Sequence, residues 1–95
     1  MSGDKLVRDN LPEIYKDKTY HVANDSEYHR ELIKKLQEEV DEFKESEEVE
    51  ELADILEVVY AIANFKEVSA EELNKIREKK AEQKGRFEKK IIYES

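Results

Sequence analysis

Four carboxylates in two pairs are the residues of this 95-residue chain whose type and spacing best suit chemistry. Glu39 and Glu42 form the first pair, and Glu51 and Asp54 form the second. Residues three apart on a helix lie on one face, with Cβ atoms about 5–6 Å apart, so each pair can direct two carboxylates at one point. Two such pairs on neighbouring helices supply the oxygen ligands that Mg²⁺ or Mn²⁺ prefers, and they leave positions for water and phosphate.

The charge around these pairs points the same way. Between residues 36 and 57 eleven acids stand against one base, Lys44, so this window carries −10 while the whole chain carries −8. At about 4 Å and an effective dielectric near 20, two like charges repel by about 4 kcal/mol. Acids brought together inside a fold therefore need a cation or protons. The alternative is that they are solvated on an outer face, because a glutamate-rich chain contains many E-x-x-E spacings by chance.

The first pair lies in a predicted long helix from a cap at Asp25 or Ser26 to about Lys44. Its apolar residues recur with helical period and form one stripe: Leu32, Ile33, Leu36, Val40 and Phe43. At 100° per residue, Glu39 falls at the border of that stripe and Glu42 falls beside it. The pattern thus places the first pair next to the buried face.

The second pair lies in a predicted helix over residues 47–64, with Ser46 as its cap. From Ile55 onward this segment is apolar on almost every side, which is typical of a central, buried helix. Glu51 and Asp54 share one side with Ile55, Val58, Ala61 and Ile62, and the opposite side is a wide apolar face of Val49, Leu52, Ala53, Leu56, Val59, Tyr60 and Ala63. We therefore expect both acids to face inward.

Two shorter segments complete the expected elements. Asn10 is predicted to cap a helix over residues 11–16, followed by a loop over residues 17–24. Ser69 and Glu72 form a capping box that opens a further helix to about residue 83, which Gly85 ends. The tail, residues 86–95, contains Phe87, Ile91, Ile92 and Tyr93, and we expect it to pack onto the rest of the chain.

The composition predicts the fold class and excludes several kinds of function. With 2 Gly, 1 Pro and abundant Glu, Lys and Leu, residues 1–95 are expected to form a single all-α domain. We predict a bundle of about four helices with an antiparallel central pair, completed by oligomerisation because so short a chain buries only about 60–65% of its unfolded surface. The acidic balance argues against nucleic-acid binding, and no apolar run is long enough for a bilayer. The absence of cysteine fits a cytoplasmic protein.

Basic residues gather near the C-terminus. Residues 75–90 contain eight Lys or Arg against three acids. They are either positive groups that face metal-bound phosphates or a solvated helix face that pairs with acids, and the pattern favours neither.

Taken together, these segments resemble the all-α nucleotide pyrophosphohydrolases, the MazG-like superfamily, and within it the small phosphoribosyl-ATP pyrophosphohydrolase-like branch. EEVDE at residues 38–42 followed by ELAD at residues 51–54 is similar to the signature E-E-x-x-E … E-x-x-D, with a short gap between the two halves. The flanking segments that share the resemblance are KLVRDNLPE at 5–13, ELADILEVVYAIA at 51–63 and KGRFEKKI at 84–91.

The resemblance implies a Mg²⁺-dependent enzyme that cleaves nucleoside triphosphates between the α and β phosphates, giving a monophosphate and pyrophosphate. It implies Glu39, Glu42, Glu51 and Asp54 as metal ligands, and a homodimer or homotetramer. We expect Glu39 or Glu42 to orient or deprotonate the attacking water. Flanking motifs and charge suggest phosphate contacts from Lys5, Arg8, Lys84 and Arg86. Removal of non-standard nucleotides is one role that fits, although the motifs specify no base.

Two readings compete with the enzyme. In one the acidic face recruits a basic protein partner, and the chain is a helical interaction module. In the other the fold binds a nucleotide as a sensor without hydrolysing it. Divalent-ion binding with release of pyrophosphate would distinguish the enzyme from both.

Overall fold

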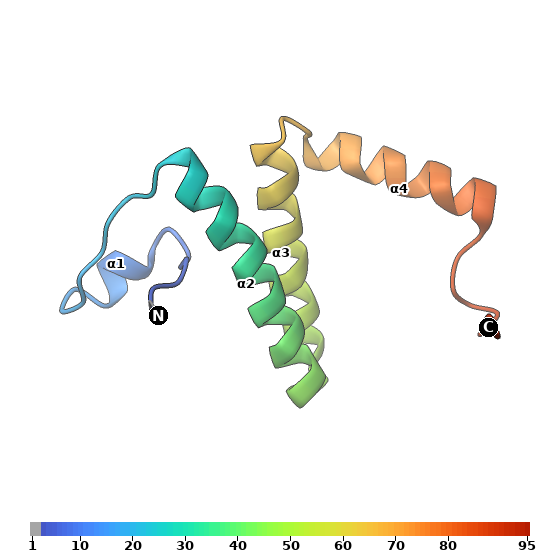
Figure 1. Cartoon of the computed structure of the whole chain (residues 1–95), viewed down its shortest axis with the longest axis horizontal. Helices are drawn as coiled ribbons and strands as arrows, with labels where there is room; N and C mark the ends of the chain where they lie inside the picture. The colour runs from blue at the N-terminus through green and yellow to red at the C-terminus, as the bar shows by residue number, and fades with distance from the viewer. Residues whose placement is uncertain (1–2) are drawn as a thin grey trace.

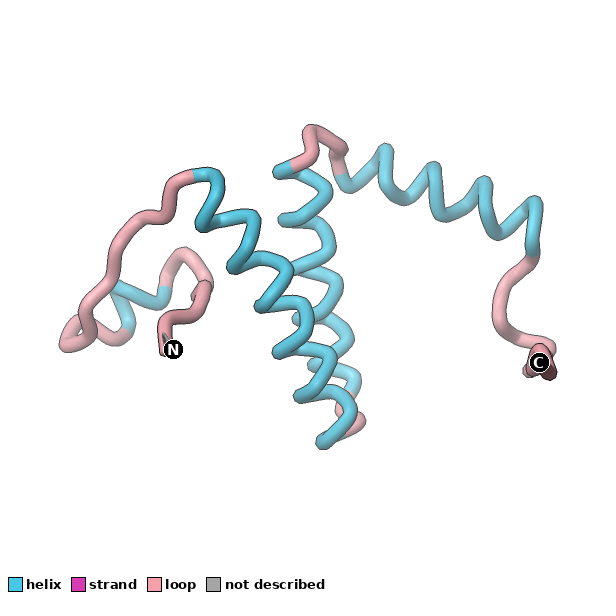
Figure 2. The backbone as a smooth tube through the Cα atoms, viewed as in Figure 1, coloured by secondary structure: helices cyan, strands magenta, loops and turns pink. Residues whose placement is uncertain are grey.

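Two long helices that run in opposite directions dominate the structure (Figure 1). The computed structural model describes residues 3–95, and it places α2 (Asp25–Ser46) against α3 (Val49–Phe65) as a hairpin. Two further helices flank this pair, α1 (Leu11–Ile14) before it and α4 (Ala70–Lys84) after it. No strand occurs within residues 3–95 (Figure 2). The predicted all-α fold of about four helices with an antiparallel central pair is confirmed.

A two-residue turn reverses the chain between α2 and α3. Glu47 adopts a left-handed conformation with φ of 56°, and its N–H donates to the carbonyl of Phe43 at 2.7 Å. Ser46 is the last residue of α2, and its hydroxyl accepts from the N–H of Glu48 at 3.2 Å. The predicted role of Ser46 as the cap of α3 is therefore wrong, because α2 continues to Ser46 and Glu48 takes the cap position.

Asn24, one residue earlier than predicted, caps the start of α2. Its side-chain oxygen accepts from the N–H of Glu27 at 2.9 Å, which satisfies one of the free donors at a helix start. Asp25 and Glu27 then lie in the first turn, where their negative charge is attracted to the positive end of the helix dipole and stabilises the helix.

The core of the chain lies between α2 and α3 and is small. Leu32 of α2 is 1% exposed and Ala63 of α3 is 8% exposed. Near the same end of the hairpin the Tyr28 ring meets Phe65 edge to face, with centroids 5.6 Å apart. Ile33, predicted in the buried stripe, is 49% exposed. The buried face of α2 is thus narrower than the stripe of apolar residues predicted from the sequence.

One side of α3 faces α2, and the opposite side is open over its first half, whereas Val59 and Tyr60 are half-buried and Ala63 is buried near its end. Its residues Ile55, Val58, Ala61 and Ile62 are half-buried, on the side that also carries Glu51 and Asp54. On the other side Val49, Leu52 and Leu56 are 47–77% exposed. The expectation of a central, buried α3 is wrong for the single chain, because only α2 packs along its length and α4 contacts it less.

Helix α4 runs away from the hairpin (Figure 1). The predicted capping box is confirmed, because the Ser69 hydroxyl accepts from the N–H of Glu72 at 3.1 Å. The helix ends at Lys84, and Gly85 follows with φ of 86°. The tail does not pack down as expected: Phe87, Ile91, Ile92 and Tyr93 are 80–99% exposed, since α4 carries them away from apolar surface.

Residues 3–10, which we call the N-terminal arm, lead into α1 and belong to no helix or strand. Asn10 occupies the predicted cap position, but its side chain makes no capping hydrogen bond. The helix ends at Ile14, two residues earlier than expected, and the Tyr20 hydroxyl donates to the Tyr15 carbonyl at 2.7 Å in the loop that follows. None of the helices in the described part of the chain has the length and apolar content needed to cross a membrane.

Because the core is small, single core residues should matter greatly. We expect Leu32→Ala to lower the free energy of unfolding by about 2–5 kcal/mol, the usual cost of a buried leucine and its cavity. Urea unfolding followed by circular dichroism measures this loss. Val22→Ala is the control, since Val22 is 98% exposed and should change stability by less than about 0.5 kcal/mol. Equal effects of the two variants would contradict this description of the core.

Candidate metal centre

Three of the four predicted metal ligands meet between the two long helices. Glu39 of α2 and Glu51 and Asp54 of α3 each offer a carboxylate oxygen, and these oxygens lie within 4.8 Å of one another. The antiparallel hairpin brings the two helices together at this level, and the three-residue spacing of Glu51 and Asp54 puts both on the α2 side. We call these three residues the acidic cluster.

Two oxygens of the acidic cluster are buried without a hydrogen-bond donor. They are Oε2 of Glu39 and Oε2 of Glu51. Glu39 is only 6% exposed, so bulk solvent reaches little of its side chain. A buried acceptor without a partner costs about 1–3 kcal/mol, and more if it is charged. An oxygen-binding cation between the helices would remove that cost, so the residues present fit a hard divalent ion.

Burial is the main cause of the raised pKa of Glu39, and the nearby carboxylate of Glu42 adds to it. The ammonium group of Lys35, 3.4 Å from Oε1 of Glu39, partly offsets both effects on this pKa. Glu42 itself is exposed and lies outside the acidic cluster. The structure therefore places the fourth predicted ligand beside the cluster on its solvent side.

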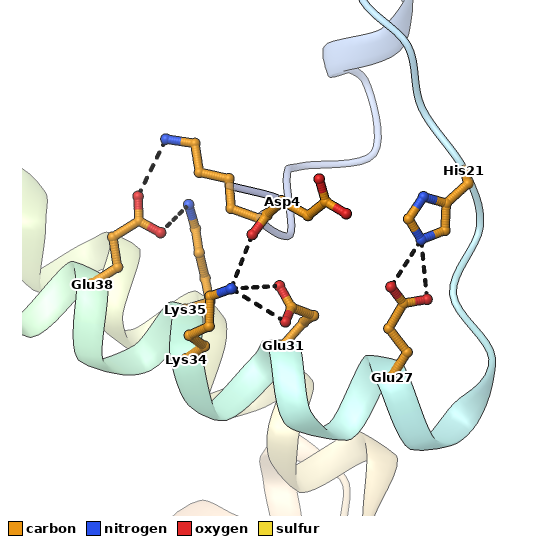
Figure 3. Close-up of polar contacts among 8 residues, drawn as sticks. Asp4, His21, Glu27, Glu31, Lys34, Lys35 and Glu38 are labelled. Carbon is orange, nitrogen blue, oxygen red and sulfur yellow. Dashed lines mark hydrogen bonds and ion pairs between the residues drawn. The ribbon is translucent and has the colours of Figure 1, made fainter. Parts of the chain in front are cut away.

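Basic side chains from two directions face these acids. The Arg8 guanidinium lies 2.7 Å from Oδ1 of Asp54, and Lys5 lies 3.4 Å from Glu38. Lys35 reaches both Glu38 and Glu39 at 3.4 Å, and Figure 3 shows its contact with Glu38. Lys35 was not predicted as part of the site, although its position four residues before Glu39 on the same helix allows the two side chains to meet.

The other two predicted phosphate contacts lie elsewhere. Lys84 is the last residue of α4. Arg86, just beyond that helix, pairs with Glu78 of α4 at 3.3 Å. Because α4 leads away from the hairpin, one chain does not bring Lys84 or Arg86 to the acidic cluster (Figure 1). Glu57 of α3 is exposed and lines the cavity described next.

A cavity of about 600 Å³ adjoins the acidic cluster, between the N-terminal arm and the hairpin. This volume lies within the range of about 300–1,000 Å³ typical of small-molecule sites. Apolar and charged groups both line it, including Leu6, Leu11, Tyr28, Leu32 and Val58 together with Arg8, Lys35, Glu39 and Asp54. A molecule with an apolar ring and an anionic group would find a complementary surface for each part.

The donor set also indicates which ion suits the cluster. All three residues offer carboxylate oxygens, the ligands of Mg²⁺, Mn²⁺ and Ca²⁺. The two histidines are engaged elsewhere: His21 lies 2.9 Å from Glu27, and the His29 ring stacks on Phe65. The chain has no cysteine, so a thiolate zinc site does not arise.

Comparisons of the chain with protein-family models, with curated proteins and with solved structures gave no match. The family resemblance of the sequence motifs therefore stays a prediction. Support for a functional site comes from the geometry of the acidic cluster and of the cavity beside it.

The raised pKa of Glu39 predicts how stability depends on pH without metal. Since its pKa is higher in the folded state than in the unfolded state, the folded protein binds the extra proton between those two values. The stabilising contribution of the Glu39 side chain should be fully present below its unfolded pKa and should be lost as pH rises through its folded pKa. We expect Glu39→Gln to remove this loss, so the variant is more stable than wild type at neutral pH.

Urea unfolding in a chelator, from mildly acidic to neutral pH, measures this difference. The exposed Glu45, in the last turn of α2, supplies the control Glu45→Gln, which should keep the wild-type profile. A Glu39→Gln variant that is less stable than wild type at neutral pH would show that the carboxylate is stabilised in the fold.

Proposed function

We propose that this protein is a Mg²⁺-dependent nucleoside triphosphate pyrophosphohydrolase. It would cleave the anhydride bond between the α and β phosphates and release a nucleoside monophosphate and pyrophosphate. The observation that carries this proposal is the acidic cluster, in which three carboxylates from two helices converge while two of their oxygens lack a donor. The cavity beside it supplies space for the substrate.

Within the proposal Glu39, Glu51 and Asp54 hold the ion, and Mn²⁺ could replace Mg²⁺. When bound, the ion would supply positive charge for the phosphate oxygens and for an attacking water molecule. Glu42 is better placed than Glu39 to act on that water, because it is exposed beside the cluster while Glu39 is buried within it. Glu42 would accept a proton from the water molecule while the water oxygen attacks the α-phosphorus, and pyrophosphate would leave.

Phosphate binding falls to the bases at the edge of the acidic cluster. Arg8 and Lys35 both line the cavity, and Lys5 lies on the same arm as Arg8. Guanidinium and ammonium groups stabilise phosphate oxygens by charge-assisted hydrogen bonds. Lys84 and Arg86 would serve only if a second copy of the chain brought them to the cluster.

The apolar part of the cavity suits the nucleoside. Leu6 and Leu11 line it from the N-terminal side, and Tyr28 and Leu32 line it from α2. Aromatic and aliphatic side chains accept the faces of any base, so this surface is compatible with several nucleotides, including non-standard ones. Triphosphate substrates of this kind place the proposed reaction in the cytoplasm.

We propose further that the chain works as a homodimer or homotetramer. The open side of α3 carries Val49, Leu52 and Leu56, whose spacing puts them on one face, opposite the acidic cluster. Contiguous exposed apolar surface of this kind is typical of an interface between subunits. A helix from a second copy would cover it and complete the central position expected for α3.

Loss of a cluster carboxylate should abolish turnover. We expect Asp54→Asn and Glu39→Gln each to lower the rate of pyrophosphate release by at least about hundredfold, since each removes an ion ligand. A panel of standard and modified nucleoside triphosphates, assayed with Mg²⁺ for pyrophosphate, identifies the substrate and measures the loss. Circular dichroism checks that the variants stay helical, and Glu45→Gln again serves as the control.

Two outcomes of this assay would contradict the enzyme. Wild-type activity in both cluster variants would remove the site. Nucleotide binding without pyrophosphate release from any substrate of the panel would instead indicate a sensor.

The open face of α3 makes a separate prediction about assembly. Light scattering after size exclusion should give at least twice the monomer mass of 11.3 kDa for the wild type. Leu52→Glu should shift the mass to that of a monomer, because it buries a charge in the proposed interface. Glu50→Gln, a change at an exposed acid of the same helix, is the control. A monomeric wild type would contradict the proposed assembly.

A further inference from the structure

The N-terminal arm is tied to both helices of the hairpin by polar contacts. The Asp4 carbonyl accepts from Nζ of Lys34 on α2 at 3.0 Å, as Figure 3 shows. Lys5 pairs with Glu38 of α2 at 3.4 Å. The third contact reaches α3, where Arg8 donates to Oδ1 of Asp54 at 2.7 Å. The arm therefore crosses from one helix to the other at the acidic cluster.

The Arg8 contact uses a carboxylate of the proposed ion site, that of Asp54. Mg²⁺ lies about 2.1 Å from its oxygen ligands, so an ion on Oδ1 of Asp54 would be within roughly 5 Å of the Arg8 nitrogen. Two cations this close to one carboxylate repel each other. Arg8 and a divalent ion therefore compete for Asp54.

Resting on the proposed function, we propose that Arg8 is a positioning residue that takes the place of the divalent ion in the metal-free protein. Its guanidinium neutralises Asp54 and holds the arm against the acidic cluster. Binding of the ion displaces it, which loosens the arm and frees the guanidinium for the phosphates of the substrate. Arg8 would thus pair first with Asp54 and then, after the ion has bound, with the phosphates of the substrate.

The structure distinguishes Arg8 from Lys35, the other base at the cluster. The Lys35 side chain is 18% exposed and stands on α2, in the same helix as its partners Glu38 and Glu39. It can keep Glu38 when an ion takes Glu39. The Arg8 side chain is 62% exposed, belongs to an arm outside any helix, and pairs only with Asp54 among the side chains of residues 3–95. Exposed ion pairs are weak, so Arg8 is the base that can leave.

Displacement of Arg8 would also open the cavity. Arg8, Leu6 and Val7 of the arm all line it, and Asp54 lines it from α3. The Arg8–Asp54 contact therefore links the arm to the hairpin at the wall of the cavity. Its release would widen access to the nucleoside surface at the moment when the ion is in place to receive phosphate.

Calorimetric titration with Mg²⁺ alone tests the competition. We expect Arg8→Gln to bind Mg²⁺ roughly two- to fivefold more tightly than wild type, the gain from removing a weak exposed ion pair. Lys5→Gln is the matched control, because it removes one positive charge from the same arm but its partner is Glu38. Its effect should be smaller than that of Arg8→Gln. Asp54→Asn should lose Mg²⁺ binding.

A second measurement follows the arm itself. The heteronuclear NOE of the backbone amides of residues 3–10 reports their order by NMR. In wild type and in Lys5→Gln, saturation with Mg²⁺ should lower this NOE. In Arg8→Gln it should be low from the start and should not respond to Mg²⁺.

Each result decides between the proposals. If the wild type binds Mg²⁺ through Asp54 but Arg8→Gln binds it no more tightly than Lys5→Gln does, the role of Arg8 is overturned and the ion site stands. An arm that stays equally ordered, or becomes more ordered, in Mg²⁺ overturns it as well. If the wild type binds no divalent ion, the proposed function fails and the role of Arg8 fails with it.

Discussion

Repulsion between carboxylates on α2 and α3 is the constraint on which the rest of this structure depends. The hairpin that buries Leu32 also brings Glu39, Glu51 and Asp54 within 4.8 Å of one another. At such distances like charges oppose the packing of the two helices. Arg8 and Lys35 compensate part of this charge, while burial and the neighbouring carboxylate of Glu42 raise the pKa of Glu39. A bound cation would supply the remainder, so folding and ion binding favour the same arrangement.

The rest of the chain does little to stabilise that arrangement by itself. Few side chains are buried, α4 leaves the hairpin, and Val49, Leu52 and Leu56 on the open side of α3 stay exposed. A domain of this size has a small net stability, because the favourable burial only slightly exceeds the entropy of ordering the chain. One side of α3 therefore carries the exposed apolar residues Val49, Leu52 and Leu56, and the other carries Glu51 and Asp54 of the acidic cluster.

Features that depend on neighbouring residues along the chain were predictable. The capping box at Ser69, the glycine that ends α4 and the inward side of Glu51 and Asp54 follow from spacing within one helix. Features that depend on what a segment meets in space were not. The tail with Phe87 looked able to pack, yet α4 directs it away from any apolar surface. Ser46 was predicted to cap α3 because serine favours the cap position, but α2 continues to Ser46, which is its last residue.

The sequence by itself determined the helices and the spacing of the acids, because helix formation and the direction of side chains along a helix are local properties. It also determined which acids share a side with apolar residues. Only the tertiary structure decided that Glu42 stays outside the acidic cluster, that Lys35 joins its edge and that Arg8 reaches Asp54. These outcomes depend on how closely two helices pack and on where an irregular arm crosses them. The sequence pattern of a single helix specifies neither the separation of two helices nor the path of the arm.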